Sequence, residues 1–93
     1  MTFTVRYYPD VLSDDLPALS RSMRERIRKA IEAKLMSAPQ DYGLPLRRTL
    51  KGYWKLRVGD CRIVFKIRED AVQVIGIGHR KDIYERMTGR LDE

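Results

Sequence analysis

Three segments in the second half of the chain alternate apolar and polar residues, and this pattern constrains the fold most. Residues 53–58 and 61–68 alternate, residues 72–77 are almost wholly apolar, and the dipeptides Gly59-Asp60 and Glu69-Asp70 separate them. Period-two alternation is typical of strands that bury one face, and such short junctions favour hairpins. We therefore expect three consecutive antiparallel strands with one core face and one outer face.

The first half of the chain predicts a strand and two helices. Residues 3–8 alternate, and residues 10–19 predict a short helical stretch. Apolar residues recur at helical spacing over residues 20–37, which predicts a longer amphipathic helix. Ser22 with a glutamate three residues later is a capping-box pattern, and Ser20 is an alternative N-cap.

Two further segments complete the predicted order β-α-α-β-β-β-α. Residues 38–50 predict a connection, and residues 82–89 predict a short last helix. The length of 93 residues allows one domain, residues 1–93. We expect an α+β fold with a mainly antiparallel four-stranded sheet packed against two N-terminal helices, and a short C-terminal helix.

The net charge of +6 is concentrated in one stretch of the chain. Seven basic residues and one acidic residue lie between Arg47 and Lys66, whereas twelve basic and twelve acidic residues elsewhere cancel. A concentrated basic segment is typical of a protein that binds a polyanion such as a nucleic acid. The alternatives are an acidic protein partner or a solvated surface.

Alternation places the basic side chains on the outer face of the predicted sheet. Lys55 and Arg57 share a face of one strand, and Arg62 and Lys66 share a face of the next. Like charges on neighbouring strands are unfavourable without a counter-charge, and phosphate suits the planar guanidinium group. Tyr53 is placed to stack on a base. A solvated, basic sheet face is the alternative interpretation.

A second candidate site follows the last predicted strand. His79, Arg80 and Tyr84 lie within six residues, and the four-residue spacing of Arg80 and Tyr84 would bring them together on one helical turn. The alternatives are a hydrogen-bonded structural histidine and a half-buried packing tyrosine.

Several classes of protein are disfavoured by the composition. Cys61 is the only cysteine and His79 the only histidine, which excludes an internal disulfide and a Cys/His zinc site. No apolar run approaches the roughly 20 residues of a membrane span, and the first residues lack a signal-peptide pattern. We expect a cytoplasmic protein without a metal, a cofactor or a membrane partner.

Four segments, in this order, resemble RelE-type toxins of the RelE/ParE superfamily of type II toxin–antitoxin systems. They read SMRERIRKAI, LKGYWKLR, CRIVF and IGHRKDIY, and the resemblance extends from Phe3 to about Arg90. It implies a fold like that of microbial RNases and a metal-independent endoribonuclease (an mRNA interferase) that cleaves mRNA in the ribosomal A site. It also implies a cognate antitoxin that holds the toxin inactive.

The resemblance also implies a catalytic set, carried over by position. Lys55 would help to deprotonate the 2′-OH, and Arg62 would bind the scissile phosphate. Arg80 would stabilise charge or protonate the leaving oxygen, and Tyr84 would orient the substrate or stack on a base. The side chains expected to contact the RNA are Lys51, Tyr53, Arg57, Lys66 and His79, of which the histidine is an alternative acid.

One departure from the family pattern leaves the general base open. The pattern has two lysines one residue apart on the first hairpin strand, but Tyr53 occupies the first of these positions and Lys51 lies upstream. Other members of the superfamily inhibit DNA gyrase. The alternative functions are therefore a ParE-like gyrase inhibitor without nuclease activity and a non-catalytic RNA-binding domain.

Overall fold

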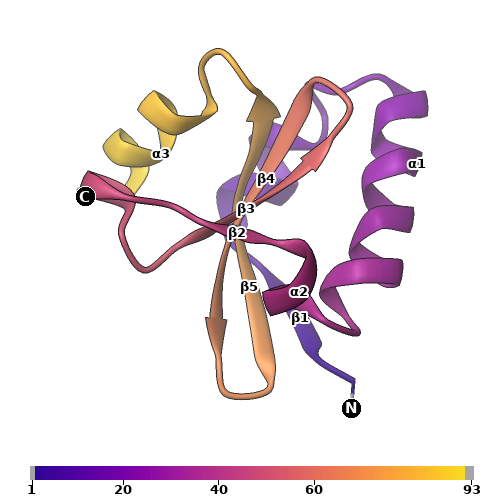
Figure 1. Ribbon diagram of the computed structural model, residues 1–93. Coiled ribbons are helices and arrows are strands. Elements are labelled where there is room, and N and C mark those ends of the chain that lie inside the picture. Colours follow the sequence, from indigo (N-terminus) through magenta and orange to yellow (C-terminus); the bar gives the residue numbers. More distant parts are fainter. Residues whose placement is uncertain (1, 92–93) are drawn as a thin grey trace.

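The computed structural model describes residues 2–91 (Figure 1). Its elements, in chain order, are β1 (Thr4–Tyr7), the turn η1 (Val11–Asp15), α1 (Arg21–Ala30), η2 (Ile31–Leu35), α2 (Pro39–Tyr42), β2 (Leu44–Pro45), η3 (Arg48–Leu50), β3 (Trp54–Val58), β4 (Cys61–Arg68), β5 (Ala71–His79) and α3 (Ile83–Leu91). Within this part of the chain, no helix is long and apolar enough to cross a membrane.

The sheet has five strands in the order β1-β5-β4-β3-β2. The two predicted hairpins are confirmed, since β3 pairs with β4 and β4 with β5 in antiparallel fashion. The prediction of four mainly antiparallel strands is wrong in two respects, because β1 pairs with β5 in parallel and β2 adds a fifth strand beside β3. Strand β2 has only two residues, one of them Pro45, so it is too short to show alternation. The direction of β1 relative to β5 depends on how the intervening helices return the chain to the sheet.

The predicted long helix is confirmed as α1 continued by η2, which together cover residues 21–35. Ser20 is its N-cap, because the Ser20 hydroxyl accepts a hydrogen bond from the Met23 amide at 3.1 Å. Glu25 pairs with Arg28 on the same helix instead of completing a capping box at Ser22. The preceding helical segment is only the single turn η1, and α2 forms where we expected a connection.

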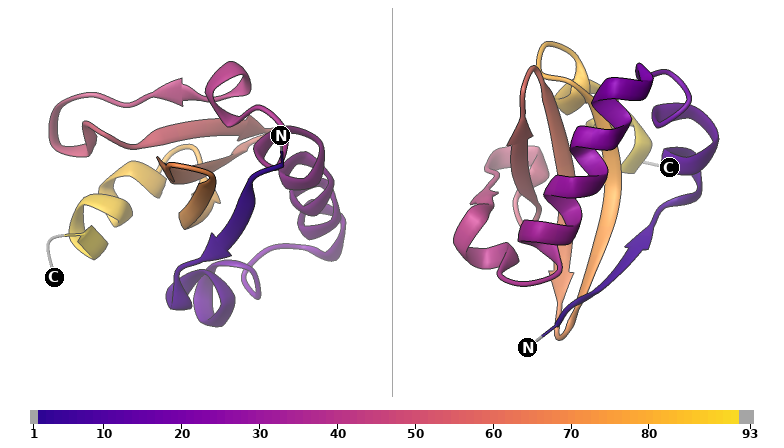
Figure 2. Two further views of the ribbon diagram at one scale, coloured as in Figure 1. Left: turned by 90° about the horizontal axis from the view of Figure 1, so that it is seen from below. Right: turned by 90° about the vertical axis from the view of Figure 1, so that its right-hand side faces the viewer.

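α1 and α3 lie on opposite sides of the sheet, as the two views in Figure 2 show. We call the side packed against α1 and η2 the α1 face; Ile27, Ile31 and Leu35 pack there against Ile63 and Phe65. We call the other side the α3 face; the buried residues that meet there are Leu50, Val64, Ile75, Ile83 and Met87. The side chains of β4 therefore divide between two apolar clusters of unequal size.

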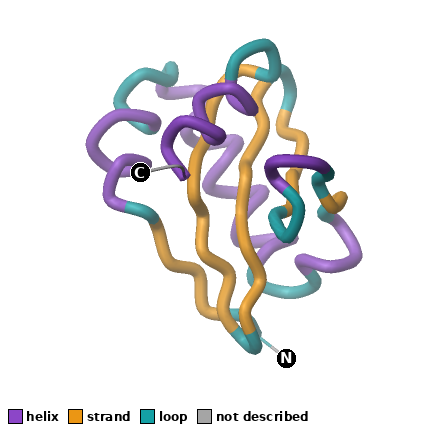
Figure 3. The backbone as a smooth tube through the Cα atoms, turned by 90° about the vertical axis from the view of Figure 1, so that its left-hand side faces the viewer, coloured by secondary structure: helices purple, strands orange, loops and turns teal. Residues whose placement is uncertain are grey.

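A β-bulge in β5 and two glycines allow α3 to approach the sheet. Val64 pairs with Gly76 but Phe65 pairs with Val74, so Ile75 is the extra residue of the bulge. A Cβ atom on Gly76 would lie 2.1 Å from the sulfur of Met87, and one on Gly78 would lie 3.0 Å from Ile83 Cδ1. Figure 3 shows α3 crossing one end of the strands and leaving the end near the β4–β5 turn uncovered.

Candidate functional site

The basic side chains of the central hairpin lie on the α3 face, as the alternation predicts. Arg57 is directly opposite Arg62, and Lys55 is directly opposite Val64. Directly opposed residues of an antiparallel pair point to the same side of the sheet. Lys55, Arg57 and Arg62 therefore share the face on which Val64 is buried, and Lys66 follows two residues further along β4.

This face is less open than the sequence suggests. Val64 is fully buried among the apolar residues of α3 and η3, although it lies on the same face of β4 as Arg62 and Lys66. Lys55 is half-buried as a result, whereas Arg57 stays exposed. The other face was expected to be partly open, and α3 covers one end of it, where Val64 meets Ile83 and Met87 (Figure 3).

Lys55 and Tyr84 form a half-buried pair on this face. The Lys55 Nζ lies 5.7 Å from the centroid of the Tyr84 ring, within the range of a cation–π contact. The Tyr84 hydroxyl is buried and has no hydrogen-bond partner within residues 2–91. A buried hydroxyl without a partner is unfavourable, so this group is poised to bond to a ligand that reaches it.

Arg62 is held at the β3–β4 turn by its own backbone surroundings. Its Nη1 atom donates to the carbonyl oxygens of Gly59 at 3.1 Å and Cys61 at 2.9 Å. The Nε and Nη2 groups make no hydrogen bond within the described chain, and a guanidinium fork with free N–H groups suits a phosphate. The side chain of Arg62 is thereby oriented without being neutralised.

Arg80 reaches the same turn by a different route from the predicted one. α3 begins only at Ile83, so Arg80 lies in the connection before it and does not share a helical turn with Tyr84. The Arg80 amide instead donates to the Asp60 carbonyl at 2.9 Å. The backbone contact places Arg80 beside the β3–β4 turn that holds Arg62, and its side chain is exposed.

The structure separates His79 from the other site residues. His79 is paired with Cys61, whose side chain packs in the cluster of the α1 face, and Arg62 is paired with Gly78 on the α3 face. The His79 Nδ1 accepts a hydrogen bond from the Lys81 amide at 3.2 Å. This geometry fits the alternative of a hydrogen-bonded structural histidine better than a role beside Lys55.

Lys66 and Tyr53 form a second cation–aromatic pair. The Lys66 Nζ lies 5.5 Å from the centroid of the Tyr53 ring. Lys51 is exposed next to η3, where Gly52 has a φ of 97° that a residue with a side chain rarely adopts. Tyr53 and Lys66 are thus brought together, whereas Lys51 lies in the loop that leads into the face.

A buried ion pair that the sequence does not reveal holds α3 in place. The Asp15 side chain has no exposed surface and contacts Arg86 at 2.7 Å and Arg90 at 2.9 Å. The hydrogen bonding of Arg90 to the Asp15 carboxylate raises the pKa of Arg90 above its ordinary range. The only signal available was two arginines four residues apart on the last helix, and nothing in the sequence connects them with Asp15.

Two comparisons with known proteins give the family. Residues 7–84 match the family model described as the ParE toxin of the type II toxin–antitoxin system parDE. The curated protein Toxin RelG of Mycobacterium tuberculosis is 31% identical over 88 residues, which cover 92% of this chain and 100% of RelG. The chain belongs to the RelE/ParE superfamily of type II toxins.

Solved structures agree with this assignment. The RelE/ParE-type toxin is similar to a chain of the RelBE2 toxin–antitoxin complex of M. tuberculosis, with a TM-score of 0.80, 27% identity and coverage of 86% of this chain and 100% of that chain. A mutant of Escherichia coli RelE in the free state has the same fold, with a TM-score of 0.73, 20% identity and coverage of 98% and 99%. The superfamily assignment inferred from the four sequence segments is therefore confirmed.

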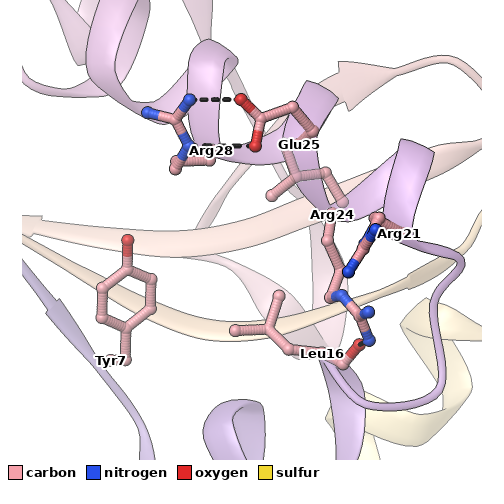
Figure 4. A pocket seen from close by; sticks show the side chains of 7 residues that line it. Tyr7, Leu16, Arg21, Arg24, Glu25 and Arg28 are labelled. Atoms are coloured by element: carbon pink, nitrogen blue, oxygen red, sulfur yellow. Dashed lines mark hydrogen bonds and ion pairs between the residues drawn. The ribbon is translucent and has the colours of Figure 1, made fainter.

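The toxin also has a groove on the side of the molecule away from Lys55. A cavity of about 350 Å³ lies between β1 and α1, with Tyr7, Leu16 and Ile27 among its lining residues. Figure 4 shows Arg21, Arg24 and the paired Glu25 and Arg28 around it.

Within residues 2–91, no group of three or more His, Cys, Asp or Glu residues is arranged to hold a metal ion.

Proposed function

We propose that this toxin is a ribosome-dependent mRNA endonuclease that cleaves mRNA in the A site. The observation that carries the proposal is the Lys55–Tyr84 pair, set on a basic face beside Arg62. The alternating cations of β3 and β4 supply a surface for the phosphates, which position a nucleic acid without reading its sequence. The half-buried pair supplies the polar groups at which chemistry would occur.

The reaction needs a base, an acid and positive charge at one phosphorus atom. The 2′-OH attacks the adjacent phosphorus, a pentacoordinate phosphorane forms, and the 5′-oxygen leaves. Lys55 is assigned the proton of the 2′-OH, and the free N–H groups of Arg62 are assigned the non-bridging phosphate oxygens. Prepositioned donors of this kind stabilise the charge that develops in the transition state.

Tyr84 and Arg80 complete the proposed catalytic set. The unpartnered Tyr84 hydroxyl can bond to a substrate oxygen while its ring continues to contact Lys55. Arg80, exposed beside the β3–β4 turn, is assigned the leaving oxygen. The nucleotides on either side of the scissile phosphate would contact Tyr53, Arg57 and Lys66. Lys51 would contact the RNA where it enters this face.

A cognate antitoxin is proposed as the protein partner. Three of the similar structures are complexes of a toxin with its antitoxin. They are RelBE2 of M. tuberculosis, RelB–RelE of Methanococcus jannaschii and YoeB–YefM of Staphylococcus aureus. The net charge of +6 favours an acidic partner, because opposite charge steers association.

Cleavage of an mRNA on programmed ribosomes tests the proposal. Wild type should cut within the A-site codon, and Lys55→Ala should lower the rate by about 100- to 10,000-fold, the usual contribution of a proton-transferring group. Arg62→Ala and Arg80→Ala should also lose most of the activity. Lys29→Ala is the matched control, because it removes the same charge from the exposed side of α1.

Each outcome of this experiment has a distinct meaning. Cleavage that survives both Lys55→Ala and Arg62→Ala would place the chemistry elsewhere and overturn the assignment. Message that is bound but left intact by wild type would indicate a non-catalytic RNA-binding domain. Such binding should weaken steeply as salt is raised.

Inhibition of DNA gyrase is the second candidate, because the matching family model is described as a ParE toxin. It predicts intact message, DNA-damage signalling in cells that express the toxin, and inhibition of supercoiling by purified gyrase. Lys55→Ala should then have no larger effect on gyrase than Lys29→Ala. Message cleavage at the A site without gyrase inhibition excludes this candidate.

A further inference from the structure

Asp15 is a fully buried charge, and it lies far from the proposed catalytic set in the sequence. Its carboxylate accepts four hydrogen bonds, one from the Ile77 amide at 2.9 Å, one from Arg86 at 2.7 Å and two from Arg90 at 2.9 and 3.0 Å. Its partners are 62 to 75 residues away along the chain. We call Asp15, Arg86 and Arg90 the α3 anchor.

The α3 anchor provides hydrogen-bond partners for the backbone groups at the edge of β5, beyond the point where β1 ends. The Tyr8 amide makes the last backbone contact from the β1 side, to the Val74 carbonyl. Beyond it, Arg90 Nη1 donates to the Ile75 carbonyl at 2.9 Å and Asp15 accepts from the Ile77 amide. The side-chain ion pair thus replaces a neighbouring strand at the point where β5 carries its bulge.

The anchor also fixes the rotation of α3 about its own axis. Ile83 and Met87 seat the helix on Gly76 and Gly78, but apolar contacts alone are not directional. Arg86 and Arg90 are four residues apart and hold one flank of the helix to a single carboxylate. Asp10 contacts Arg90 Nε at 3.4 Å, and its negative charge adds to that of Asp15.

Tyr84 projects from the opposite flank of the same helix. It lies two residues from Arg86, and at about 100° per residue the two side chains leave the helix about 160° apart. A small rotation of α3 would therefore move the Tyr84 ring relative to Lys55 Nζ, which is now 5.7 Å from its centroid. Lys55 belongs to β3 and would not follow the helix.

We infer that Asp15 is a positioning residue, which sets the placement of Tyr84 against Lys55 through Arg86, Arg90 and α3. This inference rests on the proposed nuclease function for its catalytic consequence, but its geometric part is independent of any activity. It assigns a role in the site to a residue that lies on η1 and contacts neither Lys55 nor Tyr84 through a hydrogen bond.

Fluorine NMR tests the geometric part without an activity assay. The five tyrosines are replaced by 3-fluorotyrosine in wild type and Asp15→Asn, and the Tyr84 resonance is assigned with Tyr84→Phe. The Tyr84 resonance should shift or broaden in Asp15→Asn, whereas that of Tyr42, which contacts Lys34 on the far side of the sheet, should not. An unchanged Tyr84 resonance in the folded variant would overturn the inference.

A second variant covers the case in which Asp15→Asn does not fold. Arg86→Gln removes one arm of the anchor, and the Arg86 side chain is 40% exposed, so little burial is lost. The Tyr84 resonance should again move while the Tyr42 resonance stays. A Tyr84 resonance that is identical to wild type in Arg86→Gln would count against the anchor.

A double-mutant cycle tests the catalytic part. In single-turnover cleavage on ribosomes, Asp15→Asn should lower the rate by about 10- to 100-fold through misplacement of Tyr84. The same substitution should have little effect in a Tyr84→Ala background, because residues that act through one group are not additive. Additive effects would show a merely structural role. A wild type that leaves mRNA intact overturns the proposed function, and the fluorine spectra then decide the geometric inference alone.

Discussion

The two faces of the sheet are built on different physical principles. On the α1 face, Ile27, Ile31 and Leu35 meet an apolar sheet surface, and the rings of Trp54 and Phe65 stack at 6.4 Å. On the α3 face, cations alternate with Val64 on β4, and directional hydrogen bonds to Asp15 hold the covering helix. The first face buries the larger apolar cluster, and the second combines a smaller apolar cluster with charged side chains.

This difference teaches where substitutions act. The free energy gained by apolar burial is proportional to the buried area and changes little with a small rotation, whereas the energy of a buried ion pair depends on the distance and orientation of its groups. A change on the α1 face should therefore alter the free energy of unfolding, and a change on the α3 face should alter the position of α3. Four predictions, from the largest expected effect to the smallest, test that division.

The largest effect is expected for Phe65→Ala on the α1 face. Phe65 is fully buried, and such truncations lower the free energy of unfolding by about 3–5 kcal/mol. Urea denaturation monitored by circular dichroism measures the change. Leu12→Ala is the matched control, since Leu12 is 57% exposed and should change stability by no more than about 0.5 kcal/mol. Equal effects of the two substitutions would contradict the proposed role of this face.

Gly76→Ala should have the next largest effect, because it disturbs the packing of α3 on the sheet. The new Cβ atom would meet the buried Met87 sulfur at 2.1 Å, and such overpacking costs about 1–3 kcal/mol. Unlike Phe65→Ala, it should also shift the fluorine resonance of Tyr84. Gly89→Ala is the control, because that position has open space and a helical alanine is favoured over glycine by about 1 kcal/mol. A tolerated Gly76→Ala would show that Met87 can move aside.

A smaller effect is expected at alkaline pH. Burial, and secondarily the charge of Asp60, raise the pKa of the Cys61 thiol. The unfolded chain then loses this proton at a lower pH than the folded chain, near the ordinary value of about 8.5. The stabilisation is present below that pH and is lost as the pH rises through the folded pKa.

Urea titrations at several pH values measure this loss. Wild type should become less stable as the pH rises above the ordinary thiol pKa of about 8.5, and Cys61→Ala should show a shallower decline. Some decline should remain in the variant, because burial and the nearby Glu32 also raise the pKa of Tyr7. Identical pH profiles for both proteins would rule out the contribution of Cys61.

The smallest effect is expected at the solvent side of α1. Arg28 pairs there with Glu25 and Glu32, and its hydrogen bonds lower the pKa of the Glu25 carboxyl. The pair therefore favours folding above the ordinary glutamate pKa of about 4.3, and this contribution is lost as the pH falls through the folded value. Exposed pairs contribute little. Thermal melts of Glu25→Gln at neutral pH should match wild type more closely than those of Gly76→Ala.

The central part of the fold could be predicted because its signals are local. The alternation of residues 53–68 and the Gly59-Asp60 turn predicted the β3–β4 hairpin, and helical periodicity predicted the helix that covers residues 21–35. The same alternation placed Lys55, Arg57 and Arg62 on one face, because side chains alternate strictly along a strand. Local periodicity could not give the direction of β1 or the strand β2.

The candidate site depended on long-range contacts at several points. Only the pairing register shows that His79 shares a face with Cys61 and that Arg80 contacts Asp60. The contact between Lys55 and Tyr84 requires α3 to fold back over the hairpin, and spacing along the chain does not encode that return.

The sequence by itself determined the hairpins, the long helix, the basic strand face and the superfamily, because each rests on neighbours within a few residues or on an ordered set of short segments. The tertiary structure alone decided that Asp15 meets Arg86 and Arg90, across more than 70 residues of chain. A buried charge finds its partner through the packing of the whole domain, and many arrangements of the same local elements would have left these three residues apart.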